Sequence, residues 1–253
     1  MPSVLSSSRA FRSGAASCFT LFCLGALASA SAGCKRAEDS GARAESNVQL
    51  GSAPVDFAGS YTIAQASNPG GAGTYNGAAN INRNGEVHSI TWIIANSPGY
   101  SGVALSEGNT LGVGWGMGKR YGVVVYRIQA DKLVGRWATA DSGPTPGTEE
   151  LSGSPNLEGN YTIVSAKTPK GGTYSGSVSI TPNGDTYTVQ WVLKGAEGYT
   201  GVGIREGDLF IVGWGEAGKG AGVVSYQKNG NSLVGKWAAP GSRALGKETL
   251  NKN

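Results

Sequence analysis

The chain of 253 residues is poor in the residues from which catalytic and metal sites are usually built. It contains three cysteines and one histidine, and only 15% of its residues are charged. The cysteines are Cys18, Cys23 and Cys34, so nothing beyond residue 34 can form a disulfide, a thiolate nucleophile or a cysteine-based metal site. No segment shows a capped apolar stripe of helical period. These absences argue against a helical fold and against thiol chemistry.

The charge balance argues against a nucleic-acid partner. Of the 21 lysines and arginines, Arg9 and Arg12 lie in the first 33 residues, which leaves 19 basic residues against 17 acidic ones. A nearly neutral chain without a basic stripe does not attract a phosphate backbone. We therefore expect no nucleic-acid binding.

The first 33 residues predict an export signal. Arg9 and Arg12 precede an apolar run, and the small residues 29–33 end this run just before Cys34. This ending is similar to a bacterial lipobox, in which the cysteine is acylated, although Ser31 stands where that motif usually has Leu. We predict lipidation of Cys34 and residence at the outer membrane or cell surface.

Two other readings of the N-terminus remain open. Cleavage after residues 30–32 would give a periplasmic or secreted protein, and an uncleaved signal would act as the anchor itself. Residues 34–56 are small, charged and without periodicity, which predicts a flexible tether.

Glycine and internal repetition are abundant. The chain has 42 glycines, and its second half repeats the motifs of its first half at an offset of 99 or 100 residues. All six tryptophans fall into three matched pairs: Trp92 and Trp191, Trp115 and Trp214, and Trp137 and Trp237. Tyr61 and Tyr161, Tyr75 and Tyr174, and Glu149 and Glu248 are matched in the same way. The repeat predicts two domains, 57–151 and 157–250, joined by a linker at 152–156 and each closing its own core.

Each repeat predicts an all-β fold. Apolar residues alternate with polar ones, as in Tyr187, Val189 and Trp191, and Asn-Gly and other turn signals separate about eight short runs per repeat. Asn84-Gly85 predicts a hairpin with a type I′ turn. We expect two tandem antiparallel up-and-down barrels, because closure removes exposed edges and inward glycines such as Gly135 and Gly235 suit a filled interior; a sandwich is the alternative.

No residue predicts catalysis or metal binding. His88 could be a base or a ligand, but the second repeat has Tyr187 at that position, which favours a structural role. Glu149 and Glu248 recur near the end of the last strand, where a lone carboxylate is more often solvated or salt-bridged than catalytic. The glycines of 213–218 match a dinucleotide fingerprint, but the next run reads as a strand, so we interpret them as hairpin glycines.

Four aromatic residues are the candidate partner-binding sites. Trp115 and Trp214 each lie within Gly-Trp-Gly, where flanking glycines would leave an indole face accessible to a sugar or protein; a place in the core is the other reading. Tyr100 and Tyr199 follow turn glycines and could contact a partner at the rim. The other four tryptophans are predicted core residues.

The order of motifs in each repeat is G-x-Y-x-h, T-Y-x-G, N-G, W, W-G, V-x-Y, L-x-G-x-W and E-x-L. This order resembles a glycine-rich bacterial repeat of secreted proteins often labelled fibronectin-binding, over both 57–151 and 157–250. Because its motifs are mostly structural, the resemblance implies a shared fold more than a shared activity.

These observations predict a non-enzymatic, exported surface lipoprotein. Its two domains would bind a macromolecular partner, namely a host or matrix protein or a glycan, because two weak sites on one chain gain avidity. One alternative is a barrel carrier of a small apolar ligand, which an unfilled apolar cavity would favour. Another is an envelope structural protein without a ligand. We expect no cofactor, and membrane contact only through the lipid anchor.

Overall fold

The computed structural model describes residues 55–116, 120–216 and 220–253 of the chain. These residues form sixteen β-strands and one short 3-10 helix, η1 (Pro69–Gly71). The predicted export signal, the lipidation site Cys34 and all of the predicted tether before residue 55 lie outside the described residues.

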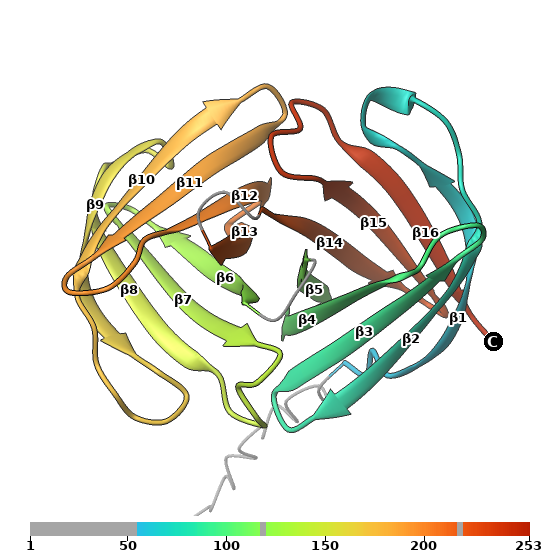
Figure 1. Ribbon diagram of the computed structural model, residues 1–253, viewed down its shortest axis with the longest axis horizontal. Helices are drawn as coiled ribbons and strands as arrows, with labels where there is room; N and C mark the ends of the chain where they lie inside the picture. The colour runs from blue at the N-terminus through green and yellow to red at the C-terminus, as the bar shows by residue number, and fades with distance from the viewer. Residues whose placement is uncertain (1–54, 117–119, 217–219) are drawn as a thin grey trace, which may run out of the picture. The chain divides into compact units, whose positions relative to one another are not determined.

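The strands close into two antiparallel barrels of eight strands each (Figure 1). Barrel 1 consists of β1 (Gly59–Ser67), β2 (Gly77–Asn84), β3 (Val87–Ile94), β4 (Tyr100–Glu107), β5 (Thr110–Gly116), β14 (Ala221–Asn229), β15 (Ser232–Ala238) and β16 (Gly246–Lys252). Barrel 2 consists of β6 (Tyr121–Gln129), β7 (Lys132–Thr139), β8 (Gly147–Gly153), β9 (Gly159–Lys167), β10 (Gly176–Asn183), β11 (Thr186–Leu193), β12 (Tyr199–Glu206) and β13 (Leu209–Glu216). The prediction of two eight-stranded barrels is confirmed, and closure excludes the sandwich.

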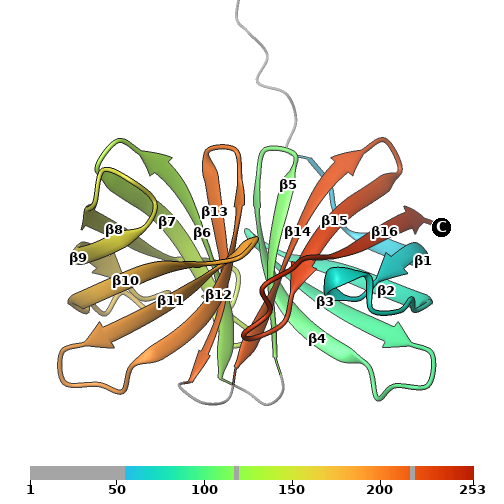
Figure 2. The ribbon, with the colours of Figure 1, turned by 90° about the horizontal axis from the view of Figure 1, so that it is seen from above.

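The two repeats exchange strands, so the prediction that each repeat closes its own barrel is wrong. Strands β1–β8 lie in the first repeat, yet β6–β8 complete the barrel of the second repeat, and β14–β16 complete the barrel of the first. Strand β5 pairs with β14, and β13 pairs with β6 (Figure 2). The predicted domain boundaries 57–151 and 157–250 therefore mark sequence repeats and not barrels.

The reason for the wrong boundaries is that the two repeats carry the same motifs in the same order. Strand β14 presents β5 with a motif that β6 also carries, since Gly222-Val223-Val224 and Tyr226 are the counterparts of Gly122-Val123-Val124 and Tyr126. The sequence alone cannot decide between two equivalent partners. The predicted linker at 152–156 is also reassigned, because it joins β8 to β9, which are neighbouring strands of barrel 2.

Three apolar clusters result from this arrangement. One fills barrel 1, around Tyr61 and Leu111, and one fills barrel 2, around Tyr161 and Phe210. The third joins outward-facing residues of strands from both barrels, including Val103, Leu105, Val123, Val125 and Ile211. A strand whose two faces are both buried reads as a nearly continuous apolar run, as β14 and β6 do.

Close approach of the barrels depends on Gly112 of β5. A Cβ atom at this position would lie 2.7 Å from Val125 Cγ2 and 2.8 Å from Ile211 Cγ2, both in barrel 2. Ile211 is the counterpart of Gly112 in the second repeat. The interface therefore packs a small residue of one repeat against a large residue at the same position of the other.

The hairpin turns begin with residues of positive φ. Gly85, Gly108, Gly184, Gly207 and Gly230 have φ between 56° and 66°. Neither Asn84 nor Glu86 has a positive φ, so the turn at Asn84-Gly85 is not the predicted type I′ turn.

Two residues other than glycine have a positive φ in the described part of the chain: Asn96, between β3 and β4, and Ala130, between β6 and β7. Ala130, the counterpart of Gly230, has a φ of 39°, a conformation that is unfavourable for a residue with a Cβ atom.

Candidate functional site

Each barrel contains a buried carboxylate. In barrel 1 it belongs to Glu248 of β16, which alternation places on the inward face with Gly246 and Leu250 and which is 4% exposed. Oε1 of Glu248 accepts hydrogen bonds from Trp92 Nε1 at 3.0 Å and from the Tyr226 hydroxyl. Oε2 accepts one from the Tyr75 hydroxyl at 2.8 Å. Three donors from three other segments thus converge on one carboxylate.

Barrel 2 repeats the same cluster. Glu149 of β8 is 3% exposed, and its Oε1 accepts hydrogen bonds from the Tyr126 hydroxyl and from Trp191 Nε1 at 3.2 Å. Its Oε2 accepts one from the Tyr174 hydroxyl at 2.9 Å. The expectation that these two glutamates are solvated or salt-bridged is therefore wrong. Alternation along the last strand of each repeat turns them inward, and their partners come from other strands and from the segments before β2 and β10.

Strand exchange makes each cluster a composite of both repeats. In barrel 1, Trp92 and Tyr75 come from the first repeat, and Tyr226 and Glu248 come from the second. In barrel 2 the contributions are reversed. With the observed strand pairing, each cluster therefore needs residues from both repeats.

A glycine sets the geometry of each cluster. Tyr226, Gly235 and Glu248 are direct cross-strand partners on β14, β15 and β16. A Cβ atom on Gly235 would lie 2.5 Å from Tyr226 Cδ1, so only glycine lets the ring lie across β15 and reach the carboxylate. Gly135 has the same role beside Tyr126, with a corresponding distance of 2.4 Å. The recurrence of V-x-Y, L-x-G-x-W and E-x-L in both repeats was the sequence signal for this cross-strand set of tyrosine, glycine and glutamate.

The electrostatics of the clusters follow from burial. Burial raises the pKa of Glu149 and of Glu248, and the hydrogen bonds from tyrosine and tryptophan oppose that rise. Burial, together with the neighbouring carboxylate, raises the pKa of Tyr126 and Tyr226, so both hydroxyls keep their protons. Among the described residues, neither glutamate has a Lys, Arg or His within ion-pair distance.

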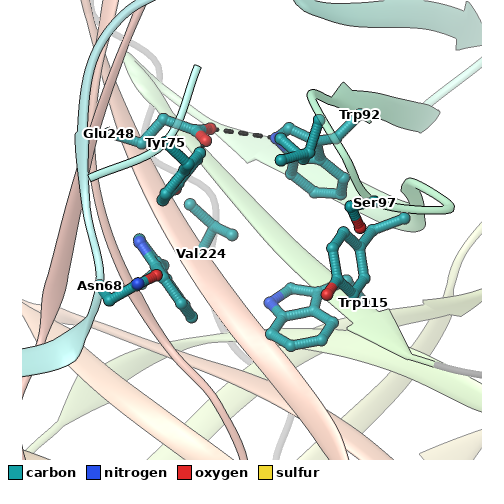
Figure 3. A pocket seen from close by; sticks show the side chains of 10 residues that line it. Asn68, Tyr75, Trp92, Ser97, Trp115, Val224 and Glu248 are labelled. Carbon is teal, nitrogen blue, oxygen red and sulfur yellow. Dashed lines mark hydrogen bonds between the residues drawn. The ribbon is translucent and has the colours of Figure 1, made fainter. Parts of the chain in front are cut away.

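A cavity lies against each carboxylate. The cavity of barrel 1 has a volume of about 200 Å³ and the cavity of barrel 2 about 170 Å³. Figure 3 shows the labelled side chains around the first cavity, with the hydrogen bond from Trp92 to Glu248 dashed. The first is lined by Asn68, Tyr75, Trp92, Ile94, Ser97, Tyr100, Trp115, Val224, Trp237 and Glu248, and the second by Val124, Trp137, Glu149, Thr168, Tyr174, Trp191, Leu193, Tyr199 and Trp214.

The cavity walls are mainly aromatic. In barrel 1, edge-to-face contacts link Tyr100 to Trp115 at 5.4 Å between ring centroids, Trp115 to Trp237 at 6.3 Å, and Trp237 to Tyr75 at 6.2 Å. Barrel 2 has the same order of rings, with centroid distances of 5.1, 5.9 and 6.1 Å. Because Tyr100 is 39% exposed, this row of rings leads from solvent to the buried carboxylate.

The structure brings the four candidate partner-binding residues to the cavities. Tyr100 and Trp115 contact each other in the wall of the first cavity, and Tyr199 and Trp214 contact each other in the wall of the second. The indole of Trp115 lies close above Gly222, which leaves the side chain half-buried. Of the predicted core tryptophans, two are buried and two are half-buried, and all four line a cavity as well.

The remaining predicted positions lie outside the cavities. His88 is buried in barrel 1 with its ring 6.2 Å from that of Phe57, edge to face, and neither ring nitrogen has a hydrogen-bond partner among the residues that the structure describes. The interpretation of 213–218 as hairpin glycines is wrong, because the flanking strands β13 and β14 belong to different barrels; Gly218 itself lies outside the described residues. In the part of the chain that the structure describes, no three metal-ligating side chains cluster.

Two closed eight-stranded barrels, each with an aromatic cavity and a buried glutamate, define the class of this protein. Comparison with family models, with curated proteins and with solved structures finds no match to this chain. No helix among the described residues is long and apolar enough to cross a membrane.

Proposed function

We propose that this chain is a non-enzymatic binding protein that holds one small ligand with an apolar ring in each barrel. The observation that carries the proposal is the duplication of the whole site: the cavity, the row of aromatic rings and the hydrogen-bonded carboxylate recur in both barrels. Ligand sites in proteins are concave and mostly apolar, with a few convergent polar groups. An apolar cavity of about 150 Å³ can hold benzene, so these cavities suit a body of one ring.

Binding is favoured over catalysis by how the polar groups are used. In each cluster, both tyrosine hydroxyls and the indole N–H point at a single carboxylate. The tyrosines are therefore engaged with the glutamate, whereas general acid–base catalysis needs groups within hydrogen-bond reach of a substrate proton. Export and lipidation at Cys34 remain part of the proposal, which places the two sites outside the cytoplasm.

The experiment fills the cavities one at a time. Val224→Phe would block the cavity of barrel 1, and Val124→Phe its equivalent in barrel 2, because both valines line the cavity walls. Titrations of the residue 35–253 fragment would use 2-phenylethanol, 2-phenylethylamine and phenylacetate, which share a ring but differ in charge. All six tryptophans line the two cavities, so tryptophan fluorescence reports on both sites.

We expect two binding sites in the wild type, one in either single variant and none in the double variant. Val134→Phe, at a position that is 40% exposed on β7, is the control that adds the same ring outside a cavity. If none of the three compounds binds the wild-type fragment, or if the filled cavities bind as well as the open ones, the proposal fails.

A macromolecular partner is a second proposal, which one observation favours. Ile93 on β3 is 59% exposed, and its counterpart Val192 on β11 is 67% exposed. Large apolar side chains exposed at the same position of both repeats suit a contact surface. Capture of matrix proteins or glycans by the wild type, and loss of that capture in Ile93→Ser combined with Val192→Ser, would support this proposal; equal capture by the variant would reject it.

A further inference from the structure

Resting on the proposed function, we infer that the ligand of each barrel is a small organic ammonium ion. Its N–H group would donate to the buried glutamate, and its apolar body would lie among the tryptophan and tyrosine rings of the cavity. The inference is carried by the hydrogen-bond inventory, the charge and the ring geometry of the two sites.

The hydrogen-bond inventory leaves each carboxylate with room for one more donor. An ionised carboxylate has about four acceptor positions on its two oxygens. Oε1 of Glu248 accepts from Trp92 and Tyr226, whereas Oε2 accepts only from Tyr75. The remaining position is therefore on Oε2, and Glu248 itself lines the cavity. In barrel 2 the same inventory leaves the open position on Oε2 of Glu149.

The charge of the site calls for a cation. A buried carboxylate is expensive unless it is both hydrogen-bonded and paired, and the described residues supply only the hydrogen bonds. Among the described residues, the lining of either cavity contains one glutamate and no lysine, arginine or histidine. A ligand that brought a positive charge would complete the pair, whereas an anionic ligand would meet repulsion.

The rings around the carboxylate suit the same ligand. Cations bind over the faces of tryptophan and tyrosine, and desolvated sites of this kind use several rings at once. Three tryptophans and two tyrosines line each cavity beside the glutamate. A primary or secondary ammonium fits better than a quaternary one, because only the former has an N–H to donate to Oε2.

The test compares ligands that differ only at the polar end, on the residue 35–253 fragment. The probes are 2-phenylethylamine, 2-phenylethanol and trimethyl(2-phenylethyl)ammonium, measured by calorimetry at neutral pH. The variants are Glu248→Gln, Glu149→Gln and their combination, because glutamine keeps the size and removes the charge. Glu150→Gln is the matched control, since Glu150 adjoins Glu149 on β8 but forms an ion pair with Lys132 at 2.7 Å.

We expect the amine to bind at two sites, at least tenfold more tightly than the alcohol, because hydrogen bonds to charged groups are the stronger ones. Each single glutamine variant should lose one tight amine site, and the double variant both, while affinity for the alcohol stays within about threefold. The control should bind like the wild type, and the trimethylated ion more weakly than the amine.

Each contrary result has its own meaning. Equal affinity for amine and alcohol, or tight amine binding by the double glutamine variant, would overturn the assignment of a cation while leaving the binding function in place. Binding of the trimethylated ion as tight as that of the amine would overturn the N–H donor. Failure of all probes to bind would refute the proposed function itself.

Discussion

Replacing Glu248 by two different residues should separate the roles of its hydrogen bonds and its charge in stability. Glu248→Gln can keep all three hydrogen bonds: the amide oxygen accepts from Trp92 and Tyr226, and the amide nitrogen donates to the Tyr75 oxygen, which can act as an acceptor. The change removes a buried charge that has no cationic partner among the described residues. We therefore expect the free energy of unfolding at pH 7.5 to change by less than about 1 kcal/mol.

Glu248→Ala should behave differently. Trp92 Nε1 keeps an acceptor, because the Tyr226 hydroxyl lies 3.2 Å away, but the hydroxyls of Tyr226 and Tyr75 lose theirs. Each buried donor without a partner costs about 1–3 kcal/mol, so the loss should be roughly 2–6 kcal/mol before any cost of the cavity. Urea unfolding of the 35–253 fragment, followed by tryptophan fluorescence, measures both changes.

The pH dependence supplies a second readout of the same substitution. Because burial raises the pKa of Glu248, the folded state binds more protons than the unfolded state above pH 4.5 or so. The stability of the wild type relative to Glu248→Gln should therefore be greatest below the unfolded pKa and should decline as the pH rises from there through the folded pKa. If Gln cost as much as Ala, or if this difference did not change with pH, our account of the buried carboxylate would be refuted.

Three further predictions concern the exchange of strands, one turn and the buried histidine. A disulfide should form in the double variant Val113→Cys, Val224→Cys, because these residues are direct partners on β5 and β14. It should not form in Val113→Cys, Val124→Cys, whose residues lie in different barrels. Mass spectrometry of the two double variants measures this, and a disulfide in the second but not in the first would show that each repeat closes its own barrel. Ala130→Gly should raise the free energy of unfolding by up to about 1 kcal/mol, because the strain that glycine relieves at a positive φ exceeds the conformational entropy that it adds to the unfolded chain. A lower midpoint in urea would contradict this. Burial lowers the pKa of His88, so the wild type should lose stability relative to His88→Phe as the pH falls below about 6.5, and parallel stability curves between pH 7.5 and 5 would reject the effect.

The site illustrates what a sequence pattern can and cannot reveal. Alternation correctly places Tyr187, Val189 and Trp191 on an inward face, and in principle it also places Glu248 inward with Leu250. The sequence does not show that two tyrosines and a tryptophan converge on this glutamate, because they come from three other segments. A short-range pattern reports which face a side chain occupies, and only closure of the barrel determines what it meets there.

The sequence by itself determined the class of fold, since period-two alternation and glycine turns are local properties of the chain. It also determined that the fold is duplicated and that the six tryptophans occupy three equivalent pairs of positions. The tertiary structure alone decided that β5 pairs with β14 instead of β6, because equivalent repeats present equivalent edges and their sequences cannot rank them. That choice joins Trp92 of one repeat to Glu248 of the other, so the composition of each site depends on it.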